Sequence, residues 1–142
     1  MNNTEYKIQF NRRVFERLQI PIIDLILMGK YYSFLLDSGS NGNVIDKEFF
    51  ETLKQDNPEL ITVRENKSTI LGLTNEEKVD VVELPLLIEN QEIMFPFSIA
   101  DLSSLRKKIR TKAGSEIEGI LGSRFFDYVG WNLDFVEWAV WK

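Results

Sequence analysis

Apolar and polar residues alternate along most of this chain, and turn-forming residues interrupt the alternation at short intervals. A repeat of two is typical of β-strands that bury one face. Pro85 and Pro96 lack the amide hydrogen that a sheet ladder needs, so we expect them at sheet edges or bulges. Strands are predicted at residues 7–10, 18–28, 31–36, 60–64, 68–71, 79–84, 85–88, 93–99, 131–135 and 139–142.

Helical spacing is confined to a few short segments. Residues 46–53 place apolar side chains three or four positions apart behind Asp46, which can cap the helix N-terminus. A second short helix is expected from Gly122 through Tyr128, and residues 101–113 are expected to form a polar connection with about one helical turn or more. The predicted fold class is mostly β, a closed or sandwiched barrel with one or two short helices.

Composition narrows the possible chemistry. The 142 residues are 44% hydrophobic and 27% charged, which indicates one globular domain over residues 1–142. Without Cys or His, the chain cannot use disulfides, Ser-His-Asp or Cys-His catalysis, or the usual zinc ligands. The sequence contains no Asp-x-Asp-x-Asp-Gly loop of the kind that binds calcium. We therefore expect no metal or cofactor. Any hydrolytic chemistry must then rely on carboxylates.

The charge of the chain argues against a nucleic-acid partner, and the length of its apolar runs argues against a membrane span. A formal charge of −5 repels a phosphate backbone, so no nucleic-acid partner is expected. The basic run at residues 106–112 is interpreted as a solvated face, with a site for an acidic partner as the less favoured alternative. No apolar run has the length of a membrane span, so we expect a soluble, cytoplasmic protein, although a chain that had lost a leader would look the same.

The segment FLLDSGSNGNV, residues 34–44, is the strongest candidate for chemistry. Its Asp, Ser, Gly and Asn residues are those of ordinary turns, and composition alone favours that interpretation. However, Asp37 directly follows three apolar residues, and the turn ends at Val44 and Ile45, so buried segments hold it on both sides. A second carboxylate placed against Asp37 would make the two groups share one proton.

This segment resembles the active-site motif of the aspartic peptidases. That motif has two apolar residues, then Asp, Thr or Ser, Gly, and Ala or Ser, with a further apolar residue seven positions after the Asp. The matching positions are Leu35, Leu36, Asp37, Ser38, Gly39, Ser40 and Val44. Ile120, Leu121 and Gly122, which open a short helix, resemble the C-terminal signature of the retropepsin-like members. The resemblance spans roughly residues 18–135 and implies an acid-protease-like closed barrel in the single-motif, half-molecule form.

The resemblance implies an endopeptidase that hydrolyses peptide bonds of a peptide or protein substrate without metal or cofactor. One motif per chain implies a homodimer in which the two Asp37 carboxylates activate a water. Ser38 would lock the two active-site loops together and Gly39 would let the chains approach closely. Ser40 would face substrate or orient the carboxylate. The family's flap corresponds to a hairpin tip at Leu71, Gly72, Leu73 and Thr74.

The sequence departs from the family pattern at two positions. Retroviral members often have an Asp four positions after the catalytic one and an Arg after the C-terminal Gly, and these two residues brace the dimer. This chain has Asn41 and Ser123 there, with Arg124 one place later. The flap region also has one Gly where family flaps tend to be glycine-rich. Another interface is therefore expected to supply part of the dimer contact.

Two other interpretations remain open from the sequence. The first is a non-catalytic peptide-binding or dimerisation module on the same fold. The second is a carbohydrate-binding barrel that uses Trp131, Trp138 and Trp141, although packing in a core or interface is the more usual role of such residues. Asp134 and Glu118 are candidate second carboxylates within the chain, and both are expected to be structural.

Overall fold

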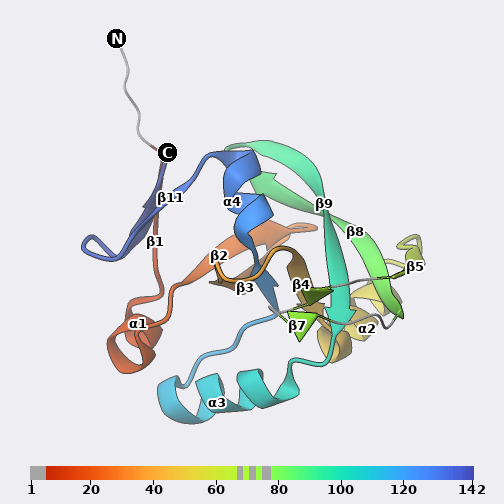
Figure 1. Ribbon diagram of the computed structural model, residues 1–142, viewed down its shortest axis with the longest axis horizontal. Helices are drawn as coiled ribbons and strands as arrows, with labels where there is room; N and C mark the ends of the chain where they lie inside the picture. Colours follow the sequence, from red (N-terminus) through yellow and green to blue (C-terminus); the bar gives the residue numbers. More distant parts are fainter. Residues whose placement is uncertain (1–5, 67–68, 71–72, 75–77) are drawn as a thin grey trace.

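The computed structural model describes residues 6–66, 69–70, 73–74 and 78–142 (Figure 1). Its elements run in the order β1 (Lys7–Gln9), α1 (Arg12–Leu18), β2 (Ile22–Leu27), β3 (Lys30–Leu36), β4 (Asn43–Asp46), α2 (Lys47–Asp56), β5 (Thr62–Asn66), β6 (Thr69–Ile70), β7 (Leu73–Thr74), β8 (Lys78–Ile88), β9 (Gln91–Ala100), α3 (Ser103–Ala113), β10 (Gly119–Leu121), α4 (Ser123–Val129), β11 (Asn132–Asp134) and β12 (Ala139–Trp141).

Six of the strands close into a barrel. Their order is β2-β3-β10-β4-β9-β8, and β8 pairs again with β2 to complete the ring, while β5 adds to β8 from outside. The β3–β10 and β4–β9 pairs are parallel and the other pairs of the ring are antiparallel. The expected closed, mostly β barrel is therefore confirmed.

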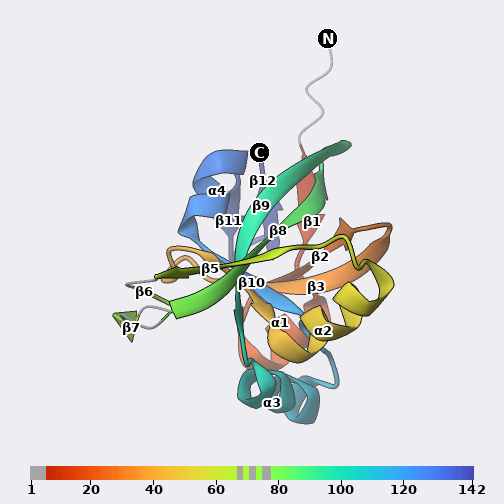
Figure 2. The ribbon, with the colours of Figure 1, turned by 90° about the vertical axis from the view of Figure 1, so that its right-hand side faces the viewer.

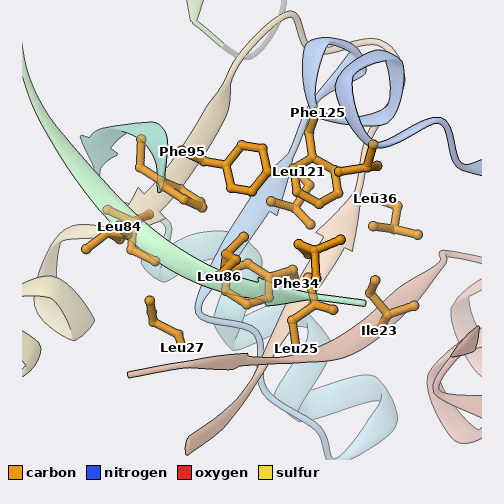
Figure 3. Close-up of a cluster of buried hydrophobic side chains, with 14 of the residues drawn as sticks. Ile23, Leu25, Leu27, Phe34, Leu36, Leu84, Leu86, Phe95, Leu121 and Phe125 are labelled. Carbon is orange, nitrogen blue, oxygen red and sulfur yellow. The ribbon is translucent and has the colours of Figure 1, made fainter. Parts of the chain in front are cut away.

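The barrel interior is filled by apolar side chains that alternate with outward-facing ones. Figure 3 shows side chains from β2, β3, β8, β9, β10 and α4 pointing toward one another. In β8 the inward residues Val82, Leu84, Leu86 and Ile88 are all buried, which is the repeat of two that the sequence shows. Burial of this alternating face fixes the register of each strand, because a slip by one residue would expose it.

A two-residue turn joins β8 to β9, and β8 is one continuous strand where the sequence predicts two, at residues 79–84 and 85–88. Glu89 and Asn90 both have positive φ between β8 and β9, as a two-residue hairpin loop requires. Pro85 and Pro96 each have a ladder partner on one side only, because β2 pairing begins at Leu86 and β4 pairing begins at Phe97. The expectation that these prolines sit at local sheet edges is confirmed.

The number of helices is larger than the sequence prediction. The described residues form four helices, where one or two were expected. α1 was missed, and the strand predicted from Leu18 begins four residues later, at Ile22. Asn11 caps α1 by accepting a hydrogen bond from the Val14 amide, and Gln19 ends it in the left-handed conformation.

The other helices lie where the sequence places them or extend further. Asp46 caps α2, as predicted, by accepting a hydrogen bond from the Phe49 amide at 3.0 Å. The connection expected at residues 101–113 is mostly helix, because α3 fills it from Ser103 to Ala113. Figures 1 and 2 show α1 and α3 side by side at one end of the barrel, where their apolar residues form a small core of their own.

The two ends of the chain form a separate three-stranded sheet. β12 lies in its centre and pairs antiparallel with β1 on one side and β11 on the other. Aromatic contacts join this sheet to the rest of the molecule, including Tyr6 stacked on Trp131 and Phe15 against Trp138. The terminal strands are therefore paired within one chain.

Candidate active site

The acidic turn begins at the end of β3, as the sequence predicts. β3 and β10 run parallel with Leu36 beside Leu121, and the Asp37 amide donates a hydrogen bond to the Leu121 carbonyl oxygen at 2.9 Å. Leu36 and Leu121 are both buried. Two core strands thus fix the backbone from which the Asp37 carboxylate projects.

Hydrogen bonds within the turn hold the Asp37 side chain. Its Oδ1 accepts a hydrogen bond from the Gly39 amide at 3.0 Å, and its carbonyl oxygen accepts one from the Ser40 amide at 3.1 Å. Asp37 is half-buried, and Ser38 and Gly39 are exposed. The turn therefore presents an oriented carboxylate beside two small residues that a second chain could approach.

Ser40 has a different position from the one expected. Its side chain is 2% exposed and its hydroxyl donates a hydrogen bond to the Gly42 carbonyl oxygen at 3.0 Å. In the single chain it neither faces outward toward a substrate nor binds the Asp37 carboxylate. Its role here is to hold the second half of the turn closed.

The Ile120-Leu121-Gly122 segment packs directly against the turn. Ile120 and Leu121 lie in β10, and a Cβ on Gly122 would come within 2.4 Å of the Gly42 carbonyl oxygen and 2.6 Å of that of Ser40. Only glycine allows this approach. The two segments that carry the family resemblance, residues 35–44 and 120–122, are therefore in contact.

Backbone hydrogen bonds join the turn to α4. The Ser123 amide donates to the Ser40 carbonyl oxygen at 2.7 Å, and the Arg124 amide donates to that of Asn41 at 3.3 Å. Asn41 and Ser123 are the residues that the sequence resemblance aligns with the bracing Asp and Arg of retroviral members. In this chain main-chain contacts at these positions connect the two segments.

Asn43 is a site residue that the sequence analysis missed. It is buried, its Oδ1 accepts a hydrogen bond from the Gly122 amide at 3.0 Å, and its Nδ2 donates to the Pro96 carbonyl oxygen at 3.3 Å. One side chain thus ties the turn to the start of α4 and to β9. In the sequence it is one of several Asn residues in a turn, and nothing local distinguishes it.

A buried ion pair supports the strand that leaves the turn. Asp46, at the end of β4, is 1% exposed, and its Oδ2 lies 2.7 Å from an Arg106 guanidinium nitrogen. Oδ1 accepts a hydrogen bond from the Leu102 amide, and Arg106 donates a second hydrogen bond to the Ile117 carbonyl oxygen. The pair connects β4, α3 and the segment that leads into β10.

Glu118 lies too far along the sheet to act with Asp37. Its side chain accepts a hydrogen bond from the Ser33 amide at 2.8 Å. Ser33, in β3, lies four residues before Asp37, and four residues of strand span roughly 13 Å. Burial raises the pKa of Glu118, the repulsion from Glu116 and Asp24 adds to the increase, and the Ser33 amide and Arg106 oppose it. Its position identifies Glu118 as a structural residue.

The raised pKa of Glu118 predicts a stability that depends on pH. The folded chain binds the proton of the Glu118 carboxyl more tightly than the unfolded chain does. The stability that Glu118 contributes is therefore complete below its pKa in the unfolded chain, and it is lost as pH rises through its pKa in the folded chain. Glu118→Gln keeps the acceptor oxygen for Ser33 and removes the ionisation. We expect the variant to be more stable than wild type at pH 7 and to lose this part of the pH dependence.

Urea unfolding between pH 4 and pH 8 measures the effect. Glu92→Gln, at an exposed position near the β8–β9 turn, is the control and should leave the pH profile unchanged. A Glu118→Gln midpoint that falls with pH as steeply as that of wild type would show that burial of this carboxyl does not control the profile.

Other candidates from the sequence have structural roles. Asp134 accepts hydrogen bonds from the Val136 and Glu137 amides, as a turn-forming residue does. Trp131 is buried, Trp138 packs on Phe15, and Trp141 lies beneath Lys7, so these three rings do not form an open platform for a sugar. The carbohydrate-binding interpretation is therefore not supported.

Only part of the expected flap can be placed. Leu71 and Gly72 lie outside the described residues, while Leu73 and Thr74 form β7, which pairs antiparallel with β6. In Figure 2 these two short strands project from the same side of the barrel as the turn that follows β3. This is the side on which a flap would cover the turn.

A cavity of about 300 Å³ opens beside the turn. Gly42, Asn43 and Arg124 form one part of its wall, and Met94, Phe95 and Tyr128 form an apolar part. Among the described residues, no cluster of three or more acidic side chains could hold a metal ion. No described helix is both long and apolar enough to cross a membrane.

Comparison with solved structures identifies the fold. A retropepsin-like aspartic protease from Rickettsia conorii matches with a TM-score of 0.55 and 17% identity, over 96% of this chain and 88% of that one. The EIAV protease complexed with the inhibitor HBY-793 matches with a TM-score of 0.52 and 15% identity, over 78% of this chain and 88% of that one. No protein-family model and no curated protein sequence matches the chain. The chain therefore has the fold of the retropepsin-like aspartic proteases.

Proposed function

We propose that this chain is an aspartic endopeptidase that acts as a homodimer, with one Asp37 from each copy. The observation that carries the proposal is the geometry of the turn. A half-buried carboxylate, oriented by the Gly39 amide, follows the end of β3 beside the parallel strand β10, and the glycine before α4 packs against the same turn at Ser40 and Gly42. The same fold in solved aspartic proteases supports this assignment.

The chemistry would require two carboxylates with one proton between them. The ionised Asp37 takes a proton from a water, whose oxygen attacks the peptide carbonyl carbon, while the protonated Asp37 donates to the carbonyl oxygen. In the collapse of the tetrahedral intermediate the C–N bond breaks, and the Asp37 that took the proton from water donates it to the leaving nitrogen. The other Asp37 takes a proton from a hydroxyl of the intermediate, which restores one proton between the two carboxyl groups. Proton sharing by such a pair is the known behaviour of aspartic peptidases and is carried over to Asp37 as part of the proposal.

Within the described part of a single chain, no second carboxylate is bound to Asp37. None of the hydrogen bonds or ion pairs among the described residues joins Asp37 to another acidic side chain, and Glu118 is several residues away along the sheet. A twofold axis beside the turn would bring the same residue from a second copy to the site. Ser38 and Gly39, both exposed, would then lie in the contact between the copies.

The surroundings of the turn suit a polypeptide substrate. The cavity beside Gly42 and Asn43 offers apolar walls for side chains of a bound peptide, and the β6–β7 pair projects on the same side of the barrel. Both features agree with an extended peptide held across the turn.

The dependence of activity on protein concentration tests the proposal. Because two chains form one site, cleavage per chain of a dye-quenched unfolded protein should rise with enzyme concentration and level off when dimers dominate. Molecular mass in solution should rise over the same range. Activity per chain that stays constant while the protein is monomeric would refute the dimeric site. Dimers that never cleave any polypeptide would instead support the non-catalytic peptide-binding or dimerisation module.

A further inference from the structure

The packing of α1 against α3 gathers much of the positive charge of the chain at one end of the barrel. Eight of the 17 Lys and Arg residues lie in these two helices, which together have 18 residues and one acid, Glu16. The other 124 residues have nine basic and 21 acidic residues, a formal charge of −12. Such an asymmetry creates a local positive field on an acidic protein.

The sequence shows only half of this surface. Residues 106–112 form a basic run, but Arg13 and Arg17 lie about 90 residues earlier in a helix that the sequence pattern did not reveal. The fold brings the two groups together: the Arg13 guanidinium lies 3.7 Å from the position that a Cβ on Gly114, at the end of α3, would occupy. Figures 1 and 2 show the two helices adjacent in both views.

Most of these cations form no ion pair with an acidic residue in the part of the chain that the structure describes. Arg106 pairs with Asp46, Arg12 with Glu16, and Arg110 with Glu116. Five others are exposed and form no ion pair with any described residue, and we call them the α1–α3 basic face. They are Arg13, Arg17, Lys107, Lys108 and Lys112.

From this charge arrangement we infer that the α1–α3 basic face is a docking surface for an acidic segment of a polypeptide partner. Carboxylates of the partner would take the place of solvent around the five unpaired cations. The inference concerns binding at this face and does not depend on Asp37 or on proteolysis.

The chemistry of the face favours a polypeptide over a membrane. The apolar residues of both helices, among them Val14, Ile109 and Ala113, are buried in the core between them. Neither helix has a large exposed hydrophobic side chain. Helices that lie in a membrane surface bury an apolar face in the lipid. Neither α1 nor α3 has an exposed apolar face.

The same face is poorly suited to nucleic acid. No exposed aromatic residue lies on either helix to stack on unpaired bases. α3 has 11 residues and is therefore about 16 Å long, which matches about five residues of an extended peptide. A longer polyanion would continue past the face and meet the acidic remainder of the molecule.

Fluorescence anisotropy with a labelled five-residue poly-glutamate peptide, the length that the face accommodates, tests the inference. We expect wild type to bind it at 50 mM salt and more weakly at 200 mM, because salt screens exposed charges. Arg17→Gln with Lys112→Gln should weaken binding about tenfold. The matched control is Lys30→Gln with Lys47→Gln, two exposed cations on other elements, which removes the same charge and should change the affinity less than twofold.

Several outcomes would overturn the inference. One is no binding by wild type at 50 mM salt, and another is an equal loss in the two double variants, which would indicate a net-charge effect. A third is tighter binding to vesicles with 30% phosphatidylserine, or to a single-stranded DNA of five phosphates, than to the peptide. Thermal unfolding of each variant by circular dichroism ensures that a loss of affinity is not a loss of fold.

Discussion

Asp37→Asn is expected to lower peptide hydrolysis by about three to four orders of magnitude while the chain stays folded and dimeric. The amide has nearly the size of the carboxylate, and its oxygen can still accept the hydrogen bond from the Gly39 amide. The amide cannot share a proton with the same residue of the second copy, and it cannot accept a proton from water. Cleavage of an unfolded polypeptide, sedimentation and thermal unfolding measure the three properties.

Asp134→Asn is the matched control for this variant. Asp134 is also a half-buried carboxylate in a turn, and it also accepts backbone hydrogen bonds. The same substitution there should leave hydrolysis unchanged. Undiminished cleavage by Asp37→Asn would remove the aspartic-peptidase assignment, whatever the fold.

Arg106→Ala is expected to lower the free energy of unfolding by about 3 kcal/mol. The substitution would leave the carboxylate of Asp46 in the interior without its positive partner, and such losses usually cost 3–5 kcal/mol. We expect the lower end of that range because Asp46 would keep the hydrogen bonds from the Phe49 and Leu102 amides. Urea unfolding at pH 7 measures the change.

Arg110→Ala supplies the comparison on the same helix. Its partner Glu116 is also an ion-pair partner of Arg106, but Arg110 and Glu116 are both about half exposed. An exposed pair contributes at most about 1 kcal/mol. If the two variants lost the same stability, the buried pair between Asp46 and Arg106 would not be the contact that anchors α3.

The sequence predicts the barrel well because apolar and polar residues alternate along a strand that buries one face. β3, β8 and β9 each bury one face, so their apolar residues recur every second position, and the hairpin between β8 and β9 follows from them. The turn at Asp37 was also placed correctly at a strand end. These features are local, or they follow from the face that each strand buries.

Features that depend on distant contacts were not visible in the sequence. α1 has only seven residues, and its apolar positions serve two different clusters, with Val14 facing α3 and Phe15 facing the main core. The bridging role of Asn43 depends on Gly122, 79 residues later. Asn11 caps this helix, but only the adjacent residues Val14 and Phe15 are buried in it, so no helical repeat of apolar residues marks the segment.

The most direct test of the account is the separation of the two Asp37 carboxyl groups in an experimental structure of the assembled protein. We predict that copies of the chain meet at this turn, with an oxygen of each Asp37 within about 3 Å of the other, close enough to share a proton. An assembly in which the two carboxyl groups lie apart, each surrounded by its own solvent, would contradict the proposed mechanism.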